Sequence, residues 1–184
     1  MTAMTPPLLP GGEAATFDEP IEMLSACHGR IRNQLATLAR LERHLPEHGH
    51  DADARAAARA ILRYFDTAAI HHHEDEERSV LPRLVARVAE ARALAERIDA
   101  EHREIAARWR RLRPLLSGIA SGQRAAMPPR LVREITAGYE AHIELEESSL
   151  LPLAREALSP PELADIGREM AERRGVAASS RGPA

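Results

Sequence analysis

The chain carries an internal repeat that strongly limits how it can fold. Shifting the 184-residue sequence by 70 positions lays HHEDEERSVLP (72–82) over HIELEESSLLP (142–152), and seven of the eleven positions are identical. Unrelated segments of this length would share roughly one position at average residue frequencies. The common core is H-x-x-x-E-E followed by Leu-Pro, which predicts two structurally equivalent segments.

Each copy of the motif supplies two candidate ligands for a metal ion. His72 and Glu76 are four residues apart in the first copy, as are His142 and Glu146 in the second. Residues at this spacing lie on one face of a helix, so each pair can point at the same centre. Imidazole and carboxylate together suit iron, and the ligand types are also compatible with zinc and manganese. Burial of such a glutamate without a counter-charge would be costly, which favours a bound metal.

Apolar residues at spacings of three and four predict four amphipathic helices. We expect them over about 20–45, from about Ala52 into the first motif, around 98–116, and from Pro129 through the second motif. PEHGHD and SGIASGQRAAMPP are the loops that separate the first pair and the last pair. Asp18 is the candidate N-cap of the first helix, with Pro20 in its first turn.

The prolines that end the two motifs are expected to disturb their helices. Pro82 and Pro152 lack the backbone N–H that a helix interior needs, so each should kink or end its helix.

The first and third helices each place one histidine within their apolar stripe. A 74-residue shift lays His28 over His102 and Leu24 over Ile98. Residues of an antiparallel hairpin lie level when they are equally far from its turn. The position halfway between 28 and 74 is 51, in the first loop, and halfway between 102 and 144 is 123, in the second. The position halfway between 74 and 102 is 88, which predicts a further turn near Val88.

These levels predict an all-α, up-down-up-down antiparallel four-helix bundle with a short C-terminal helix and tail. Such bundles build metal sites in their core from side chains on facing helices. We expect a flexible leader over 1–18, the bundle over 19–157, and a short helix with a disordered tail over 158–184.

The two lone histidines and the doubled H-x-x-x-E-E with Leu-Pro resemble the hemerythrin-like (HHE cation-binding) domain family over about 20–157. This resemblance implies a non-haem di-iron centre with oxo or hydroxo and carboxylate bridges. The ligands it implies are His28 and His72 on one iron, His102 and His142 on the other, and Glu76 and Glu146 between them. Glu77 and Glu147 are the neighbouring alternatives for the bridges, and the choice between Glu146 and Glu147 stays open.

One departure from the oxygen-carrying members bears on function. They have a second histidine on the third helix, four residues after the first, where this chain has Ala106. The missing imidazole argues against simple O₂ carriage. The resemblance then implies a protein that binds iron and O₂, NO or peroxide for sensing, scavenging or storage. The alternative is an enzyme that decomposes peroxide, reduces nitric oxide or repairs iron centres.

The neighbouring polar residues have ordinary interpretations. His71 and His73 lie about 100° to either side of His72 on a helix, and we expect both at the surface. His73 is kept as a candidate ligand that ranks below the six main ones. Glu74 and Asp75 read as a solvated acidic face. Cys27 reads as a small core residue. A ferritin-like site is disfavoured, because no glutamate stands three residues before any of the four histidines.

Composition excludes several other classes of protein. A net charge of -3 with 29% charged residues gives no basic excess for nucleic acid. No apolar run reaches the about 18 to 20 residues of a membrane span. A single cysteine excludes an internal disulfide and fits the cytoplasm. The oligomeric state stays open.

Overall fold

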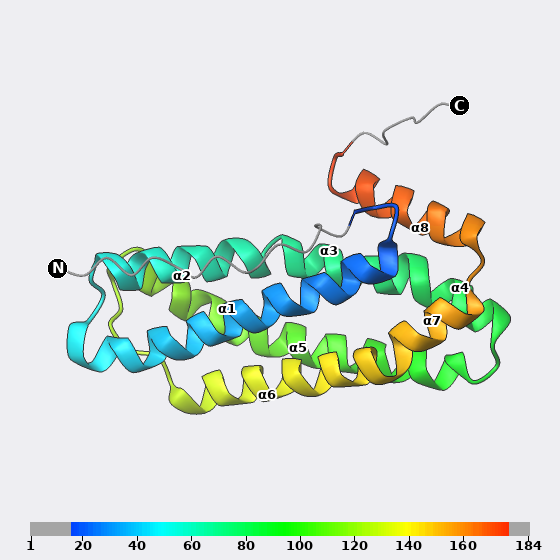
Figure 1. Ribbon diagram of the computed structural model, residues 1–184. Coiled ribbons are helices and arrows are strands. Elements are labelled where there is room, and N and C mark those ends of the chain that lie inside the picture. Colours follow the sequence, from blue (N-terminus) through cyan, green and yellow to red (C-terminus); the bar gives the residue numbers. More distant parts are fainter. Residues whose placement is uncertain (1–15, 177–184) are drawn as a thin grey trace.

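The computed structural model describes residues 16–176 (Figure 1). Within this range the chain is helical and contains no strand, which confirms the all-α prediction. The elements are α1 (Pro20–His48), α2 (Ala52–Phe65), α3 (Ala68–Asp75), η1 (Glu76–Val80), α4 (Leu81–Arg87), α5 (Ala91–Ala120), α6 (Pro129–Leu145), η2 (Glu146–Leu150), α7 (Leu151–Ala157) and α8 (Pro160–Arg173). The predicted leader and tail lie largely outside the described residues.

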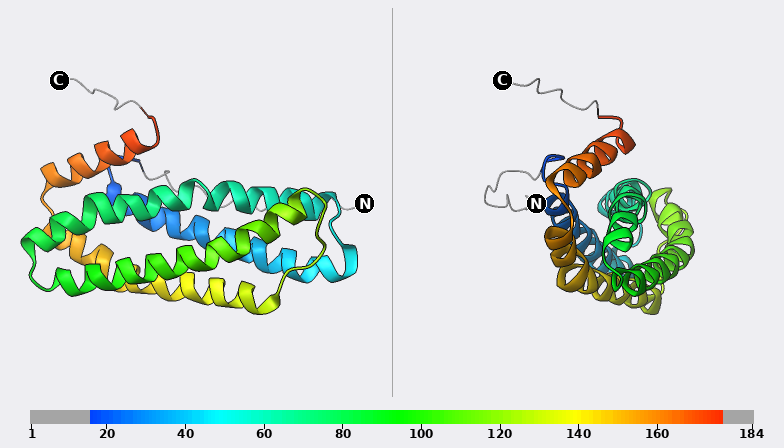
Figure 2. Two further views of the ribbon diagram at one scale, coloured as in Figure 1. Left: turned by 180° about the vertical axis from the view of Figure 1, so that it is seen from behind. Right: turned by 90° about the vertical axis from the view of Figure 1, so that its right-hand side faces the viewer.

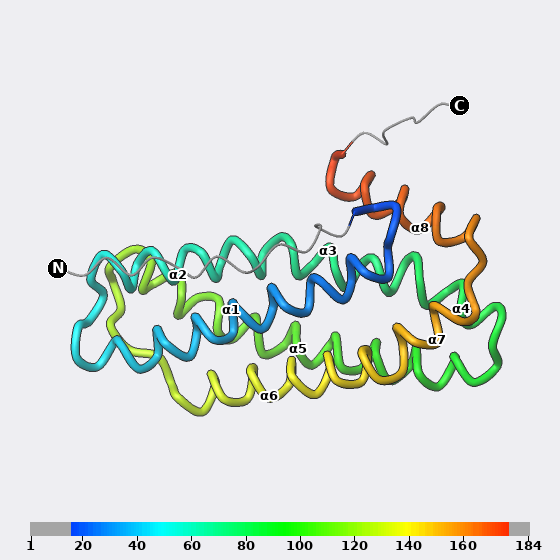
Figure 3. Tube along the Cα trace, in the orientation of Figure 1, coloured from blue at the N-terminus to red at the C-terminus, as the bar shows by residue number. Residues whose placement is uncertain are grey.

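The helices pack side by side along one long axis. α1 packs against α2 and α6, and α5 packs against the same two helices from the other side. The path from α2 through α3 into α4 continues in one direction, as does the path from α6 into α7 (Figure 3). The end-on view in Figure 2 shows α8 outside this group of helices.

Two apolar clusters fill the interior and leave a polar layer between them. One cluster includes Ile31 and Ile105, and the other includes Leu24 and Ile98. The buried histidines of α1 and α5 lie between these pairs in the sequence, so the candidate site separates the two clusters. The site is therefore enclosed by apolar side chains on both sides.

The helix boundaries follow the predicted turns with local differences. The turn expected near Val88 is present, since α4 ends at Arg87 and α5 begins at Ala91. The N-cap prediction for α1 is wrong, because Glu19 occupies that position and makes no side-chain cap hydrogen bond. The second predicted helix is interrupted between Phe65 and Ala68.

Both motifs pass through a π-helical turn just before the proline, and a new α-helix continues beyond it. η1 and η2 each begin at the inner glutamate, and the N–H of Leu81 and of Leu151 donates five residues back, to the carbonyl of Glu76 and of Glu146. The proline is then the second residue of the following helix, where a missing N–H is tolerated. Single π turns are rare and are found mainly at functional sites.

α8 is clamped onto the first motif by a buried ion-pair cluster. Asp75 is fully buried, and its carboxylate accepts from Arg173 at 2.9 Å and from Arg174 at 2.7 Å. The expectation that Asp75 belongs to a solvated face is therefore wrong. Asp75 is buried because α8 packs against α1, α3 and η1 and covers it. A Cβ at Gly167 would lie 1.8 Å from the carbonyl oxygen of Phe17, so only glycine permits this approach.

No helix among residues 16–176 combines the length and the apolar character that a membrane crossing requires.

Candidate metal centre

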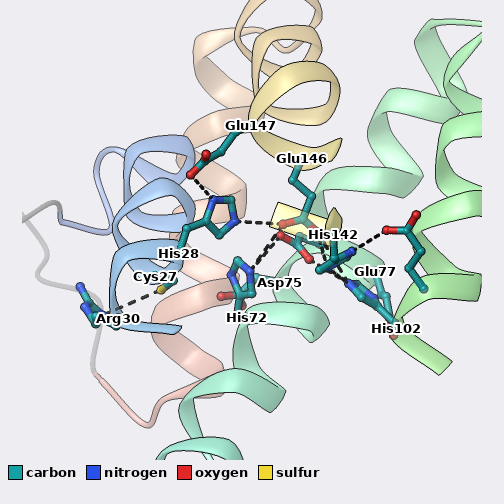
Figure 4. A network of polar contacts seen from close by, with 12 residues as sticks. Cys27, His28, Arg30, His72, Asp75, Glu77, His102, His142, Glu146 and Glu147 are labelled. Atoms are coloured by element: carbon teal, nitrogen blue, oxygen red, sulfur yellow. Dashed lines mark hydrogen bonds and ion pairs between the residues drawn. The ribbon is translucent and has the colours of Figure 1, made fainter. Parts of the chain in front are cut away.

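Six side chains, each from a different helical element, converge in the polar layer. Each is at most 4% exposed, although each is polar or ionisable. They are His28 on α1, His72 on α3, Glu76 at the start of η1, His102 on α5, His142 on α6 and Glu146 at the start of η2. Figure 4 shows the labelled members facing one another. These are the residues that sequence reasoning selected, and the fold brings them together.

The six donors form two overlapping groups that share both carboxylates. His28 and His72 form one group with Glu76 and Glu146, and His102 and His142 form the other with the same two glutamates. Within each group all ligand atoms lie within 4.8 Å of one another. Two groups of candidate ligands therefore lie side by side and have both carboxylates in common.

Glu146 lies at the centre of the cluster. One carboxylate oxygen is 2.9 Å from His28 Nε2, and the other is 2.8 Å from His142 Nε2. The Nε2 atoms of His72 and His102 each lie 3.8 Å from this carboxylate. A single side chain thus reaches all four histidines.

Glu76 occupies the matching place on the opposite side. Its oxygens lie 3.4 Å from His72 Nε2 and 3.3 Å from His102 Nε2. Glu77 and Glu147, the neighbouring alternatives, turn away from this centre, and their side chains are 40% and 36% exposed.

The inner donors lack hydrogen-bond partners, which is the observation that tests whether a metal fits. Both carboxylate oxygens of Glu76 and of Glu146 are buried without a hydrogen bond, and so is Nε2 of His28 and of His72. The Nε2 atoms of His102 and His142 face each other at 3.0 Å. Buried polar groups are nearly always satisfied, so such a cluster of bare donors fits a cation.

Carboxylates outside the cluster hold the outer nitrogens of three histidines. His28 Nδ1 lies 3.1 Å from Glu147, and His102 Nδ1 lies 2.6 Å from Glu77. His142 Nδ1 lies 3.1 Å from Glu101. Such hydrogen bonds fix the tautomer and orientation of a metal-binding imidazole and raise its basicity.

Sequence reasoning missed two residues of this outer layer. Glu101 directly precedes His102 and pairs with His142 on the neighbouring helix. Arg32 forms two hydrogen bonds of 2.9 Å to Glu147, which in turn contacts His28. A glutamate next to a candidate histidine was a usable signal for Glu101. No local pattern indicated Arg32, because its partner is 115 residues away.

His73 departs most from its sequence-based expectation. Its ring stacks on His102 with centroids 4.0 Å apart, and it meets the ring of His142 edge-on at 5.7 Å. Nε2 of His73 is buried without a hydrogen bond. His73 is therefore partly buried against histidines of α5 and α6, and not at the surface as expected. His73, His102 and His142 form a further group of converging donors.

The buried ionisable groups of the cluster shift one another's pKa. Burial together with the charge of Glu146 raises the pKa of Glu76. Burial would also raise the pKa of Glu146, but the close imidazoles of His102 and His142 hold it well below its ordinary value. Burial and the neighbouring histidines lower the pKa of His73, which keeps this imidazole neutral. Neutral imidazole and ionised carboxylate are the forms that bind metal.

These features define an all-helical protein with a buried histidine and glutamate cluster of the kind that holds cations. The chain belongs to the family described as the Hemerythrin HHE cation binding domain, whose model matches residues 19–154. A protein of Haemophilus influenzae named "Uncharacterized protein" is 35% identical over 162 residues, which cover 88% of this chain and 94% of that protein. α8 lies beyond the residues that the family model matches.

Proposed function

We propose that this protein binds two iron ions in an up-down-up-down four-helix bundle and uses them to bind a small molecule such as O₂, NO or peroxide. The observation that carries the proposal is the set of bare, buried donors on Glu76 and Glu146, which lie between two pairs of histidines. His28 and His72 would hold one metal, His102 and His142 the other. Iron supplies redox and Lewis-acid chemistry that these side chains lack.

His73 makes the two proposed positions unequal. It would give the His102–His142 position a third imidazole, in a chain that has Ala106 where the oxygen carriers have their second third-helix histidine. The His28–His72 position would keep two imidazoles and the shared carboxylates. Fewer protein ligands leave room for a small molecule at the His28–His72 position.

The chain's own residues prepare this centre in two ways. Glu77, Glu101 and Glu147 orient the imidazoles by their contacts to Nδ1. The apolar clusters on both sides exclude water and limit access, which favours a small uncharged ligand over a large substrate.

An enzyme is the second candidate function. The smaller number of protein ligands at the His28–His72 position favours it as well. A protein that decomposes peroxide or reduces nitric oxide also needs a place where the reactant meets the metal. Mixing the iron-loaded, reduced protein with peroxide or with NO separates the two classes. Multiple turnovers with a suitable reductant support an enzyme, whereas binding at fixed stoichiometry supports a binding protein.

Metal loading is expected to stabilise the fold. The metal would bind the folded cluster and neutralise buried donors that otherwise lack partners. With free metal about 1,000-fold above its Kd, the free energy of unfolding should rise by about 4 kcal/mol. Thermal unfolding of iron-loaded and chelator-treated protein measures this difference. Identical unfolding of the two samples would contradict a cation at this site.

Metal binding is expected to tighten as pH rises. Burial would lower the pKa of His102, but the nearby carboxylates of Glu146 and Glu76 raise it to about 11 in the metal-free protein. His102 is therefore protonated at neutral pH, and the metal must displace that proton. Because the pKa is raised above the unfolded value, the proton stabilises the metal-free fold most below about pH 6.5.

The expected slope is about tenfold in apparent metal affinity per pH unit for each proton released. Titration with zinc at several pH values, with proton release followed in weak buffer, measures this slope. An affinity that stays constant from about pH 6 to about pH 8 would contradict it.

A further inference from the structure

The four core histidines differ in what holds their outer ring nitrogen. Nδ1 of His28, His102 and His142 each meets a carboxylate at 3.1 Å or less. Nδ1 of His72 is buried and makes no hydrogen bond. His72 is 1% exposed, so bulk solvent does not reach this atom. One imidazole of the four therefore lacks the support that the others receive.

The internal repeat identifies the residue that stands in place of the missing carboxylate. The 74-residue shift that lays His28 over His102 lays Cys27 over Glu101. Glu101 holds His142, and the equivalent partner for Cys27 is His72. The Cys27 side chain is buried, and it lies beside the His72 imidazole where α1 packs against α3 (Figure 4). A thiol is a much weaker hydrogen-bond acceptor than a carboxylate.

We propose that Cys27, by replacing a carboxylate behind His72, makes the His28–His72 position the weaker and more readily exchanged of the two metal positions. This inference rests on the proposed two-metal centre. A carboxylate behind an imidazole strengthens its bond to metal, and losing such an outer partner typically costs about 10- to 100-fold in affinity. The protein would thus keep one metal firmly and exchange the other as the metal supply changes.

The placement of His73 acts in the same direction. Its imidazole converges with those of His102 and His142 as a group of candidate ligands, and it is not part of the group formed by His28 and His72, although its ring lies 5.8 Å from that of His72. The stronger position gains a donor, while the weaker one has a thiol behind one of its two imidazoles. Two independent features of the sequence therefore favour the same order of affinity.

A reciprocal pair of variants tests the role of Cys27. Cys27→Asp places a carboxylate behind His72, and the guanidinium of Arg30, 3.9 Å from the present sulfur, offers a counter-charge. Glu101→Cys makes the opposite change behind His142. Cys27→Ala is the matched control, because it removes the sulfur without adding a carboxylate.

The measurement is an anaerobic Fe(II) titration of each full-length variant, with Mössbauer spectra at one and two equivalents. The wild type should bind in two steps that differ by about 10- to 100-fold. Cys27→Asp should tighten the weaker step alone, and Glu101→Cys should weaken the stronger step alone. Cys27→Ala should keep two unequal steps.

The outcomes separate this inference from the proposed function. A wild type that binds no iron contradicts the metal centre itself. A wild type that binds two irons, with a weaker step that Cys27→Asp leaves unchanged, contradicts the role of Cys27 alone. If Cys27→Asp fails to fold, Glu101→Cys still tests the inference. The inference expects this variant to weaken the stronger binding step alone. A change in the weaker step, or in neither step, contradicts it.

Discussion

Glu146→Gln is expected to abolish binding of at least one of the two metals. Glu146 reaches all four histidines, at 2.8 to 3.8 Å, and its carboxylate oxygens have no hydrogen-bond partner of their own. The amide keeps the size of the side chain but loses the negative charge that would bridge two cations. The loss of affinity should exceed the about 10- to 100-fold that removal of an outer hydrogen bond causes.

Glu147→Gln is the matched control for this variant. Glu147 is the next residue, but its side chain is 36% exposed and contacts Nδ1 of His28 and the guanidinium of Arg32. This variant should retain both metals with moderately reduced affinity. Metal content per chain after desalting measures both effects. Retention of two metals by both variants would contradict the assignment of Glu146 as the shared ligand.

Asp75→Ala is expected to cause the largest loss of stability. Asp75 is fully buried and forms ion pairs with Arg173 and Arg174, whose side chains are 14% and 18% exposed. Removing one member of a buried ion pair typically costs about 3 to 5 kcal/mol. For a chain of this size, that corresponds to a decrease of about 6 to 20 °C in Tm. α8 should detach from η1 at the same time.

The control for this variant is an exposed ion pair on the same helix. Asp165 pairs with Arg168, and both side chains are about half exposed. Asp165→Ala should change the free energy of unfolding by less than about 0.5 kcal/mol. Thermal unfolding and limited proteolysis within α8 measure both variants. Equal stability of the two would show that the buried cluster does not anchor α8.

The core of the site was predictable because its residues recur at fixed intervals along the sequence. The 70-residue repeat selected His72, Glu76, His142 and Glu146, and the levels of the hairpins added the two lone histidines. A helical bundle places residues by their distance from a turn. Two visible loops and one inferred turn therefore brought these side chains to one layer.

The remaining features depend on contacts that no local pattern contains. His71 and His73 are equivalent flanks of His72 on a helical wheel. Yet the ring of His73 packs against those of His102 and His142, whereas His71 pairs with Glu74 of its own helix. Asp75 looks like part of an acidic surface until α8 supplies two arginines from about 98 residues away. The π turns had one usable sign, the Leu-Pro that follows both glutamate pairs.

The most direct test of the central claim is the metal content of the protein. Elemental analysis of protein purified from iron-supplied cells, with an optical spectrum before and after exposure to air, gives this in one preparation. We predict about two irons per chain and near-ultraviolet charge-transfer bands that change with oxygen. One zinc per chain, or no metal at all, would contradict the di-iron assignment.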